Sequence, residues 1–349
     1  MREINETFLK ACRGEKTEYT PVWLMRQAGR YLPQYQKVAA KADFLTICRT
    51  PELAAEVTIE PVDALGVDAA IFFSDITTTV VPMGIKLEYA DNLGPYYPDP
   101  LRRKADIDRL TVPEPAESLA FVYQAQKILA RELASRVPLI GFAGAPFTMA
   151  AFMVEGVVSH AFTHTRSLIF REPRLFHSLM DKVSRFTAKY LKAQARAGCQ
   201  AVMLFDSFAG MLGPKDFMEF NYPYLKSTIA DLNRTGVPVI YFGLGQHGAL
   251  EQIGGLGAEV IGVDYGINLN SAVARLGPGV TVQGNIEPYV LLGPEKPMRE
   301  RVKEVLAQGR GARAHIFNLG HGVPISTPVA NARAMVSAVH EFTGKQAGI

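Results

Sequence analysis

The sequence predicts an α/β fold in which residues 1–349 form a single (β/α)8 TIM barrel with an elaborated loop after its second strand. Eight short apolar runs recur along the chain with helical stretches between them, and no Gly/Ser-rich linker divides the chain. A polar or glycine-rich segment follows every run, at the position where the active-site residues of such barrels lie. A doubly wound sheet with an appended domain is the alternative architecture that these repeats leave open.

The eight expected strands are runs of apolar and β-branched residues, as in parallel strands that are covered on both faces. They span residues 21–24, 69–73, 138–142, 201–205, 238–242, 259–263, 280–283 and 315–318. Because residues 74–137 separate the second run from the third, the loop after the second strand is expected to be long and elaborate.

Helical periodicity and the residues at helix ends place the helices. Across residues 173–198, apolar side chains recur every three or four positions, which predicts one long amphipathic helix. Residues 1–16 have the same spacing and predict an opening amphipathic helix. Thr50 and Thr327, each followed by proline, are the expected N-caps of two further helices.

Composition and charge are those of a globular protein with a substantial core, because 48% of the residues are hydrophobic and 20% are charged. The net charge of +3 and the lack of a Lys/Arg stripe disfavour a nucleic-acid-binding protein. No apolar run approaches the ~20 residues that are needed to cross a bilayer. Cys12, Cys48 and Cys199 are widely separated and form no CxxC pair, which is typical of a reducing compartment. We therefore expect a cytoplasmic protein.

Two arginines stand four residues apart directly after the first expected strand. If this segment continues as a helix, Arg26 and Arg30 lie on one face of it. Gly29, between them, permits the close approach of a ligand or of another backbone segment. Because guanidinium groups fork onto carboxylates, the pair predicts a site for a polyanionic ligand. A surface arginine pair bonded to nearby acids is the alternative.

Three further polar residues follow expected strands. Asp75, behind an apolar run, is either an acceptor in a partly desolvated pocket or the N-cap of the next helix. His321 stands between two glycines that permit a tight turn against a ligand, or else it marks an exposed structural turn. Ser207 lacks a G-x-S-x-G elbow, so it is expected to be a hydrogen-bond donor and not the nucleophile of a hydrolase.

No motif predicts a metal or an organic cofactor. His160 and His164 are four residues apart but lack the glutamate of a zincin. The GxGxxG spacing at residues 243–248 lies late in the chain and has no acidic partner at the required distance, so it is not expected to bind a dinucleotide.

Six blocks are spread along nearly the whole chain, namely residues 21–33 (PVWLMRQAGRYLP), 73–76, 142–148, 205–207, 283–285 and 317–322 (FNLGHG). In these blocks the sequence resembles the uroporphyrinogen decarboxylase family. The resemblance implies a single (β/α)8 barrel, usually a homodimer whose two clefts face each other. It also implies conversion of the four acetate side chains of uroporphyrinogen III to the methyls of coproporphyrinogen III in haem biosynthesis.

The resemblance further implies the roles of individual residues. Asp75 and Arg26 would be catalytic, with Asp75 bound to the central pyrrole N–H groups of the substrate. Ser207 and His321 would hold peripheral carboxylates. The residues implied to contact the substrate are Arg26, Gln27, Ala28, Gly29, Arg30, Asp75, Phe152, Ser207 and His321.

The chemistry of an acetate decarboxylation agrees with these roles. Loss of CO2 needs an electron sink, and most enzymes take it from a cofactor. A pyrrole supplies its own sink once its α-carbon is protonated, because the resulting cation accepts the departing electrons. The protein then needs a buried anion, a proton source and cationic clamps for the carboxylates. We therefore expect activity without a metal or an organic cofactor.

Two positions depart from the family. Phe152 stands where tyrosine is common, so a hydroxyl implied to support the aspartate is missing, and Glu287 stands where aspartate is usual. We expect Phe152→Tyr to raise kcat/KM modestly. The alternative functions are those of a corrinoid-dependent methyltransferase-like barrel with a zinc site and of a non-catalytic tetrapyrrole-binding protein.

Overall fold

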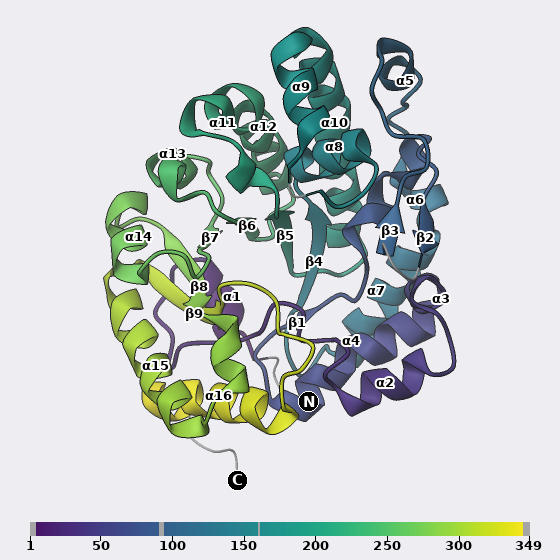
Figure 1. Ribbon diagram of the computed structural model, residues 1–349. Helices are drawn as coiled ribbons and strands as arrows, with labels where there is room; N and C mark the ends of the chain where they lie inside the picture. The colour runs from purple at the N-terminus through teal and green to yellow at the C-terminus, as the bar shows by residue number, and fades with distance from the viewer. Residues whose placement is uncertain (1–4, 91–93, 160, 345–349) are drawn as a thin grey trace.

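Seven parallel strands form one curled sheet in the computed structural model, which describes residues 5–90, 94–159 and 161–344 (Figure 1). The strand order is β1-β4-β5-β6-β7-β8-β9, and every neighbouring pair is parallel. The strands of this sheet are β1 (Ala70–Ile71), β4 (Leu139–Gly144), β5 (Ala201–Asp206), β6 (Val239–Gly243), β7 (Val260–Gly262), β8 (Thr281–Ile286) and β9 (Ala314–Leu319). Each expected strand from the second to the eighth overlaps one of them, so these seven strands are confirmed, although several end a few residues away from the expected bounds.

Residues 21–24, the first expected strand, connect the two edges of this sheet by backbone hydrogen bonds. Val22 forms a parallel bridge with Phe317 of β9, and the Phe317 amide donates to the Pro21 carbonyl at 2.8 Å. On the other side, the Asp68 amide donates to the Val22 carbonyl at 2.8 Å, immediately before β1. The segment therefore contributes a single bridge residue where a full strand was expected.

Helices follow most strands and cover the outer face of the sheet (Figure 1). They are α1 (Thr7–Cys12), α2 (Pro33–Ala39), α3 (Phe44–Arg49), α4 (Pro51–Leu65), α5 (Lys104–Asp108), α6 (Pro115–Ser118), α7 (Ala120–Glu132), α8 (Pro146–Glu155), α9 (Thr163–Arg171), α10 (Pro173–Arg196), α11 (Pro214–Phe220), α12 (Tyr222–Asn233), α13 (Leu250–Gly254), α14 (Leu269–Leu276), α15 (Glu295–Gln308) and α16 (Val329–Thr343). Among the described residues, none of these helices has the length and apolarity of a membrane-spanning helix.

The predicted helix boundaries are confirmed in some places and wrong in others. The long amphipathic helix is α10, which begins at Pro173 as expected and buries its apolar face. Thr50 is the N-cap residue of α4 and Pro51 its first residue, as expected, although the Thr50 hydroxyl donates to the Thr46 carbonyl at 2.8 Å and caps no amide of α4. Thr327 stands one residue too early to be an N-cap, because Pro328 occupies that position before α16.

An insertion of several elements separates β1 from β4. It contains the 3-10 helix η1 (Ile76–Met83), the antiparallel pair β2 (Glu88–Ala90) and β3 (Gly94–Tyr96), and helices α5, α6 and α7. After β3 the chain returns to α8, where the Tyr97 amide donates to the Gly156 carbonyl at 2.6 Å and the Leu101 amide to the Met153 carbonyl at 2.9 Å. These bonds fix the exit of the β2–β3 pair against the C-terminal end of α8.

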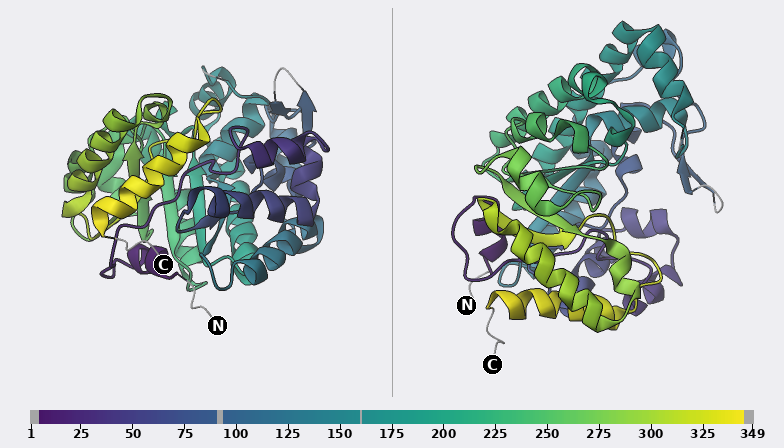
Figure 2. Two further views of the ribbon diagram at one scale, coloured as in Figure 1. Left: turned by 90° about the horizontal axis from the view of Figure 1, so that it is seen from below. Right: turned by 60° about the vertical axis from the view of Figure 1, so that its left-hand side comes forward.

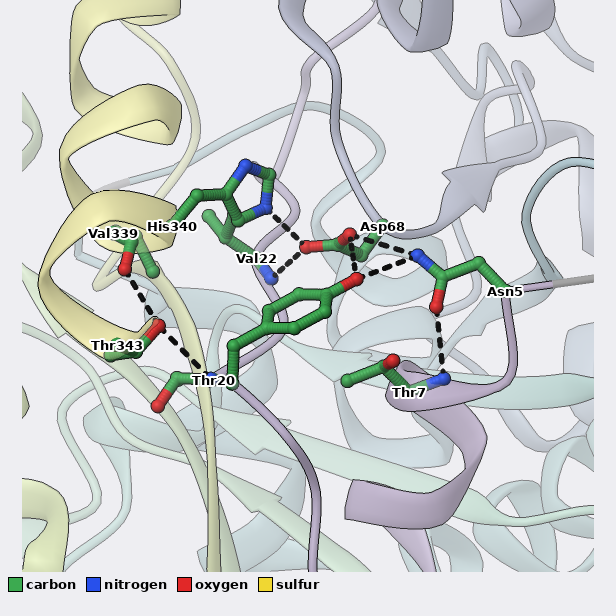
Figure 3. A network of polar contacts seen from close by, with 9 residues as sticks. Asn5, Thr7, Thr20, Val22, Asp68, Val339, His340 and Thr343 are labelled. Carbon is green, nitrogen blue, oxygen red and sulfur yellow. Dashed lines mark hydrogen bonds and ion pairs between the residues drawn. The ribbon is translucent and has the colours of Figure 1, made fainter. Parts of the chain in front are cut away.

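Asp68 joins the beginning of the chain to its last helix. Its carboxylate is 1% exposed and accepts from the Val22 amide at 2.9 Å, from the Tyr19 hydroxyl at 2.9 Å and from His340 Nε2 at 2.7 Å (Figure 3). Asn5 Nδ2 donates to the same carboxylate at 3.1 Å. These contacts explain why α16 lies beside the N-terminal segment in Figure 2.

We predict that Asp68→Ala lowers the free energy of unfolding by about 3 kcal/mol or more, because it leaves several buried donors without their common acceptor. Urea denaturation of the purified protein measures this change. Asp63→Ala is the control, since Asp63 is exposed and its ion-pair partner among the described residues is Arg136 alone, and a change within about 0.5 kcal/mol is expected there. A loss below about 1 kcal/mol for Asp68→Ala would mean that the network does not hold the termini together.

Candidate active site

A cavity of about 460 Å³ opens at the carboxyl ends of the strands. Its polar lining comes from the segment after residues 21–24, from the turn after β1, and from the segments after β5 and β9. The predicted site residues that line it are Arg26, Ala28, Gly29, Arg30, Asp75, Ser207 and His321. The fold therefore brings together side chains that are far apart in the sequence.

Asp75 has two structural roles at once. Its carboxylate caps η1, because it accepts the Thr77 amide at 2.6 Å and also the Thr77 hydroxyl. The Thr78 hydroxyl donates to the Asp75 carbonyl at 2.8 Å, which fixes the backbone of the same turn. Because Asp75 also lines the cavity, the N-cap and the pocket acceptor that the sequence left as alternatives are one and the same carboxylate.

The surroundings of Asp75 are mostly apolar. Burial raises the pKa of the Asp75 carboxyl, while the two hydrogen bonds from Thr77 and the charge of Arg26 act in the opposite direction. The apolar and aromatic residues that line the cavity around it are Ile71, Phe72, Phe73, Ile76, Phe142, Phe205 and Phe242. In such a poorly screened site, an ionised carboxylate stabilises a nearby cation far more strongly than it would in water.

The two arginines enter the cavity from a series of turns and not from a helix, so the helical expectation is wrong. Arg26 adopts a left-handed backbone conformation with φ +60°, which is strained for a residue with a side chain. Gly322 leaves the room that the Arg26 side chain occupies, since a Cβ there would clash with it. Among the described residues, no carboxylate forms an ion pair with Arg26 or Arg30, which leaves both guanidinium groups available to an anionic ligand.

His321 lines the cavity, where its surroundings favour the neutral imidazole. Burial lowers the pKa of this imidazole and the positive charge of Arg26 lowers it further, while Asp264 acts weakly in the opposite direction. Gly320 precedes it where a Cβ would collide with the backbone of Tyr265, so glycine is required for this close approach. A neutral imidazole can donate or accept a hydrogen bond without adding charge to the cavity.

Gln27 does not line the cavity. Its buried side chain accepts the Leu24 amide at 3.1 Å and donates to the Ala69 carbonyl at 3.1 Å. The Tyr31 hydroxyl donates to the Gln27 carbonyl at 2.8 Å. The side chain thus ties residues 21–24 to the entry of β1 and holds the arginine segment in place.

Phe152 and Glu287, the two positions that we expected to depart from the family, also lie outside the cavity lining. Phe152 is buried in α8, edge-on to Tyr97 at 5.1 Å between ring centroids and parallel to Phe208 at 6.3 Å. Glu287 caps the short helix after β8, where its carboxylate accepts the Tyr289 amide at 3.2 Å.

Several cavity residues were not predicted from the sequence. Ser74 Oγ is buried beside Asp75 and has no hydrogen-bond partner among the described residues, although it lines the cavity. Its position directly before Asp75 was the signal that could have identified it. Tyr35 and Tyr89 come from α2 and β2, which are outside the strand-end segments that directed the search.

Two other strand-end carboxylates are structural. Asp206 is fully buried and accepts from Thr148 Oγ1 at 2.6 Å, Asn221 Nδ2 at 2.7 Å and the Tyr241 hydroxyl at 3.1 Å. Asp264 is likewise buried and accepts two backbone amides and His247 Nε2, the last at 2.5 Å. Neither lines the cavity, so Asp75 is its carboxylate within the part of the chain that is described.

The described residues contain no group of three His, Cys, Asp or Glu side chains that could hold a metal ion. Of the two histidines considered in the sequence, His160 lies outside the described residues. Cys12, Cys48 and Cys199 are buried, and burial raises the pKa of each thiol far above its usual value.

Comparison with solved structures relates the fold to methyltransferases. A methyltransferase from Methanosarcina mazei superposes with a TM-score of 0.82 at 20% identity, covering 98% of this chain and 99% of that chain. A B12-independent methionine synthase from Shewanella sp. W3-18-1 superposes with a TM-score of 0.56 at 11% identity, covering 84% of this chain and 87% of that chain. At these identities the similarity concerns the fold alone.

Comparison of sequences is more specific. The profile described as Uroporphyrinogen decarboxylase (URO-D) matches residues 3–342. Proteins named uroporphyrinogen decarboxylase from Desulfotalea psychrophila and Geobacter metallireducens are each 48% identical over 342 residues, which cover 98% of this chain and the whole of each relative. The protein of that name from Carboxydothermus hydrogenoformans is 46% identical over 340 residues, with 97% of both chains covered. The chain belongs to the uroporphyrinogen decarboxylase family.

Proposed function

We propose that this chain decarboxylates the four acetate side chains of uroporphyrinogen III, giving coproporphyrinogen III in porphyrin and haem biosynthesis. The observation that carries the proposal is the Asp75 carboxylate, held by Thr77 in a largely apolar cavity that Arg26 and Arg30 also line. A cavity with one buried anion and two unpaired cations suits a substrate that has acidic side chains and develops positive charge on its ring. Membership of the family supports the same reaction.

The architecture that goes with this function is a single (β/α)8 barrel over residues 1–349. Residues 21–24 act as the first strand in chain order and bring the number of strands to eight, since their backbone bonds reach both β9 and the entry of β1. The insertion between β1 and β4 is the elaborated loop after the second strand, and Tyr89 of β2 brings it to the cavity.

Each polar residue of the cavity has a role in this reaction. Asp75 binds the central pyrrole N–H groups and faces the positive charge of the ring. Arg26 assists it and, with Arg30, pairs with substrate carboxylates, as a guanidinium fork does with a carboxylate. Ser207 and the neutral His321 donate hydrogen bonds to peripheral carboxylates. Ala28 and Gly29 form the wall between the arginines, and Gln27 holds that wall in position from behind.

The steps of the decarboxylation need no external electron acceptor. A proton adds to the α-carbon of a pyrrole and makes the ring a cation. The bond between the acetate methylene and its carboxylate then breaks, CO2 leaves, and the electron pair of that bond neutralises the ring. A proton adds to the methylene carbon to give the methyl, and the proton on the α-carbon is released. Asp75 lowers the energy of the cation throughout, as a charge already in place before the reaction.

The chain is expected to act as a cytoplasmic homodimer whose clefts face each other. Tyr89 and Ile325 at the cavity mouth are 39% and 66% exposed, and a second copy would cover such apolar side chains. Three free, buried cysteines agree with a reducing compartment. Sedimentation equilibrium tests the dimer.

Because the fold is similar to that of a methyltransferase, the alternative function to test is that of a methyltransferase-like barrel with a zinc site. We predict that the protein decarboxylates uroporphyrinogen under anaerobic conditions after exhaustive chelation, because the pyrrole ring supplies the electron sink. Chromatography after oxidation of the products counts the carboxyl groups that remain. Loss of turnover on chelation, with recovery on adding zinc, would support the methyltransferase-like alternative. Binding without turnover would support the tetrapyrrole-binding protein.

We predict that Asp75→Asn lowers kcat by at least ~100-fold while the protein folds normally, because the amide keeps the shape of the side chain but not its charge. Asp43→Asn is a matched control: Asp43 caps α3 through the amide and hydroxyl of Thr46, as Asp75 caps η1 through Thr77, but it is exposed and outside the cavity. Circular dichroism shows whether each variant folds, and the kinetics show whether the loss of activity comes from the missing charge of Asp75 or from the loss of a helix cap. Similar kinetic losses in the two would reduce Asp75 to a structural cap.

Because burial raises the pKa of Asp75, we expect activity to fall on acidification at a higher pH than an ordinary aspartate would impose. The carboxyl must be ionised to stabilise the cation, so activity is present above its pKa and lost as the pH falls through it.

A further inference from the structure

Thr77 positions the Asp75 carboxylate, and Thr77 is in turn held by a hydrogen bond from another residue. Thr77 gives Asp75 both its amide and its hydroxyl, so the position of the Thr77 backbone determines where the carboxylate lies. The Thr77 carbonyl accepts the hydroxyl of Tyr97 at 2.8 Å. Tyr97 comes from the segment after β3, twenty residues further along the chain.

Tyr97 is fixed at both ends. Its amide donates to the Gly156 carbonyl at the end of α8, at 2.6 Å. Gly156 has φ +84°, and a Cβ there would lie 3.0 Å from the Tyr97 carbonyl oxygen, so this close contact needs glycine. The phenol is 2% exposed, and burial together with the charge of Asp75 raises its pKa well above the usual value. The hydroxyl is therefore a permanent donor.

The same tyrosine contacts the position at which this chain departs from its family. Phe152 lies one turn before Gly156 in α8, and its ring packs edge-on against that of Tyr97 at 5.1 Å between centroids. Phe208 covers another side of Phe152, so aromatic rings pack against Phe152 from two sides. A chain with phenylalanine at position 152 has no hydroxyl to offer from there, whereas the neighbouring ring does carry one.

We propose that Tyr97 is a positioning residue for Asp75, and that its hydroxyl, acting through Thr77, takes over the support that Phe152 cannot give. The inference rests on the proposed decarboxylation, in which Asp75 is the catalytic anion. In this chain the supporting hydroxyl comes from the segment that packs against α8 and not from α8 itself, and the rings of Tyr97 and Phe152 are in contact.

A double-mutant cycle tests this exchange with the full-length enzyme and uroporphyrinogen as substrate. The variants are Tyr97→Phe, Phe152→Tyr and the double variant, and the parent is assayed first. Tyr97→Phe is expected to lower kcat about tenfold with little change in KM, the size expected for one lost hydrogen bond. Phe152→Tyr alone raises kcat/KM less than about threefold, because Asp75 is already supported. In the Tyr97→Phe background, the same change restores most of the lost kcat.

The pH dependence of kcat gives a second readout that a purely structural role would not move. Hydrogen bonds from Thr77 and the charge of Arg26 both lower the pKa of Asp75. Among the described residues, Cys48 and Tyr97 also lie close enough for the charge of Asp75 to raise their pKa values. If Tyr97→Phe loosens the Thr77 turn, the pKa of Asp75 rises and the acidic limb of the profile moves to higher pH. The limb returns toward its original position in the double variant.

Tyr123→Phe is the matched control for the loss of a buried phenol hydroxyl. Tyr123 lies in α7, and its hydroxyl has no hydrogen-bond partner among the described residues. Its removal should leave kcat and the pH profile unchanged.

The outcomes separate this inference from the proposed function. An inactive parent would overturn the proposed function. An active parent with Tyr97→Phe unchanged in kcat and pH profile would overturn the role of Tyr97 alone. Additive effects, with no rescue in the double variant, would show that Tyr97 does not replace a hydroxyl at position 152.

Discussion

A carboxylate that has to stay charged inside a mostly apolar cavity is the constraint on which the site depends. Burial raises the pKa of Asp75, so the protein must offset the loss of hydration with its own donors. Thr77 provides two hydrogen bonds and Arg26 provides charge. The strained φ of Arg26 and the close approach at Gly322 follow from the need to bring that guanidinium into the cavity.

The sheet supplies the rigid frame for this arrangement. Residues 21–24 bond to β9 on one side and to the entry of β1 on the other, so the arginine segment, Asp75 and His321 emerge from adjacent backbone segments. Gln27 adds a side-chain link between the same two segments. At the opposite end of these strands, Asp68 joins the first residues to α16. The Asp68 contacts that hold the ends of the chain together and the arginine segment of the cavity therefore both depend on residues 21–24.

Sequence patterns were sufficient for seven of the eight expected strands and for part of the cavity lining at their ends. Asp75, Ser207 and His321 could be placed at one cavity because parallel strands end on the same side. The path of the arginine segment was not predictable, because Arg26 has a left-handed backbone and its side chain packs against Gly322, almost three hundred residues away. Gln27 was expected at the substrate, yet its amide is used between backbone segments.

The role of Tyr97 could not be predicted from the sequence, for a different reason. It lies outside the expected strands and helices, and its importance comes from packing on α8 and from bonding to Thr77, neither of which a local pattern encodes. The resemblance to the family drew attention to Phe152 as a missing hydroxyl. Only the three-dimensional neighbourhood of that ring suggests which residue compensates for it.

The ionisation state of Asp75 is the most direct test of this account. Infrared difference spectra between the parent and the Asp75→Asn enzyme, recorded over a range of pH, report whether the carboxyl is charged. The account predicts a carboxylate at neutral pH that takes up a proton above the range of an ordinary aspartate, since burial raises its pKa. A carboxyl that is already protonated at neutral pH would contradict the account, because a neutral acid cannot stabilise the cation of the substrate.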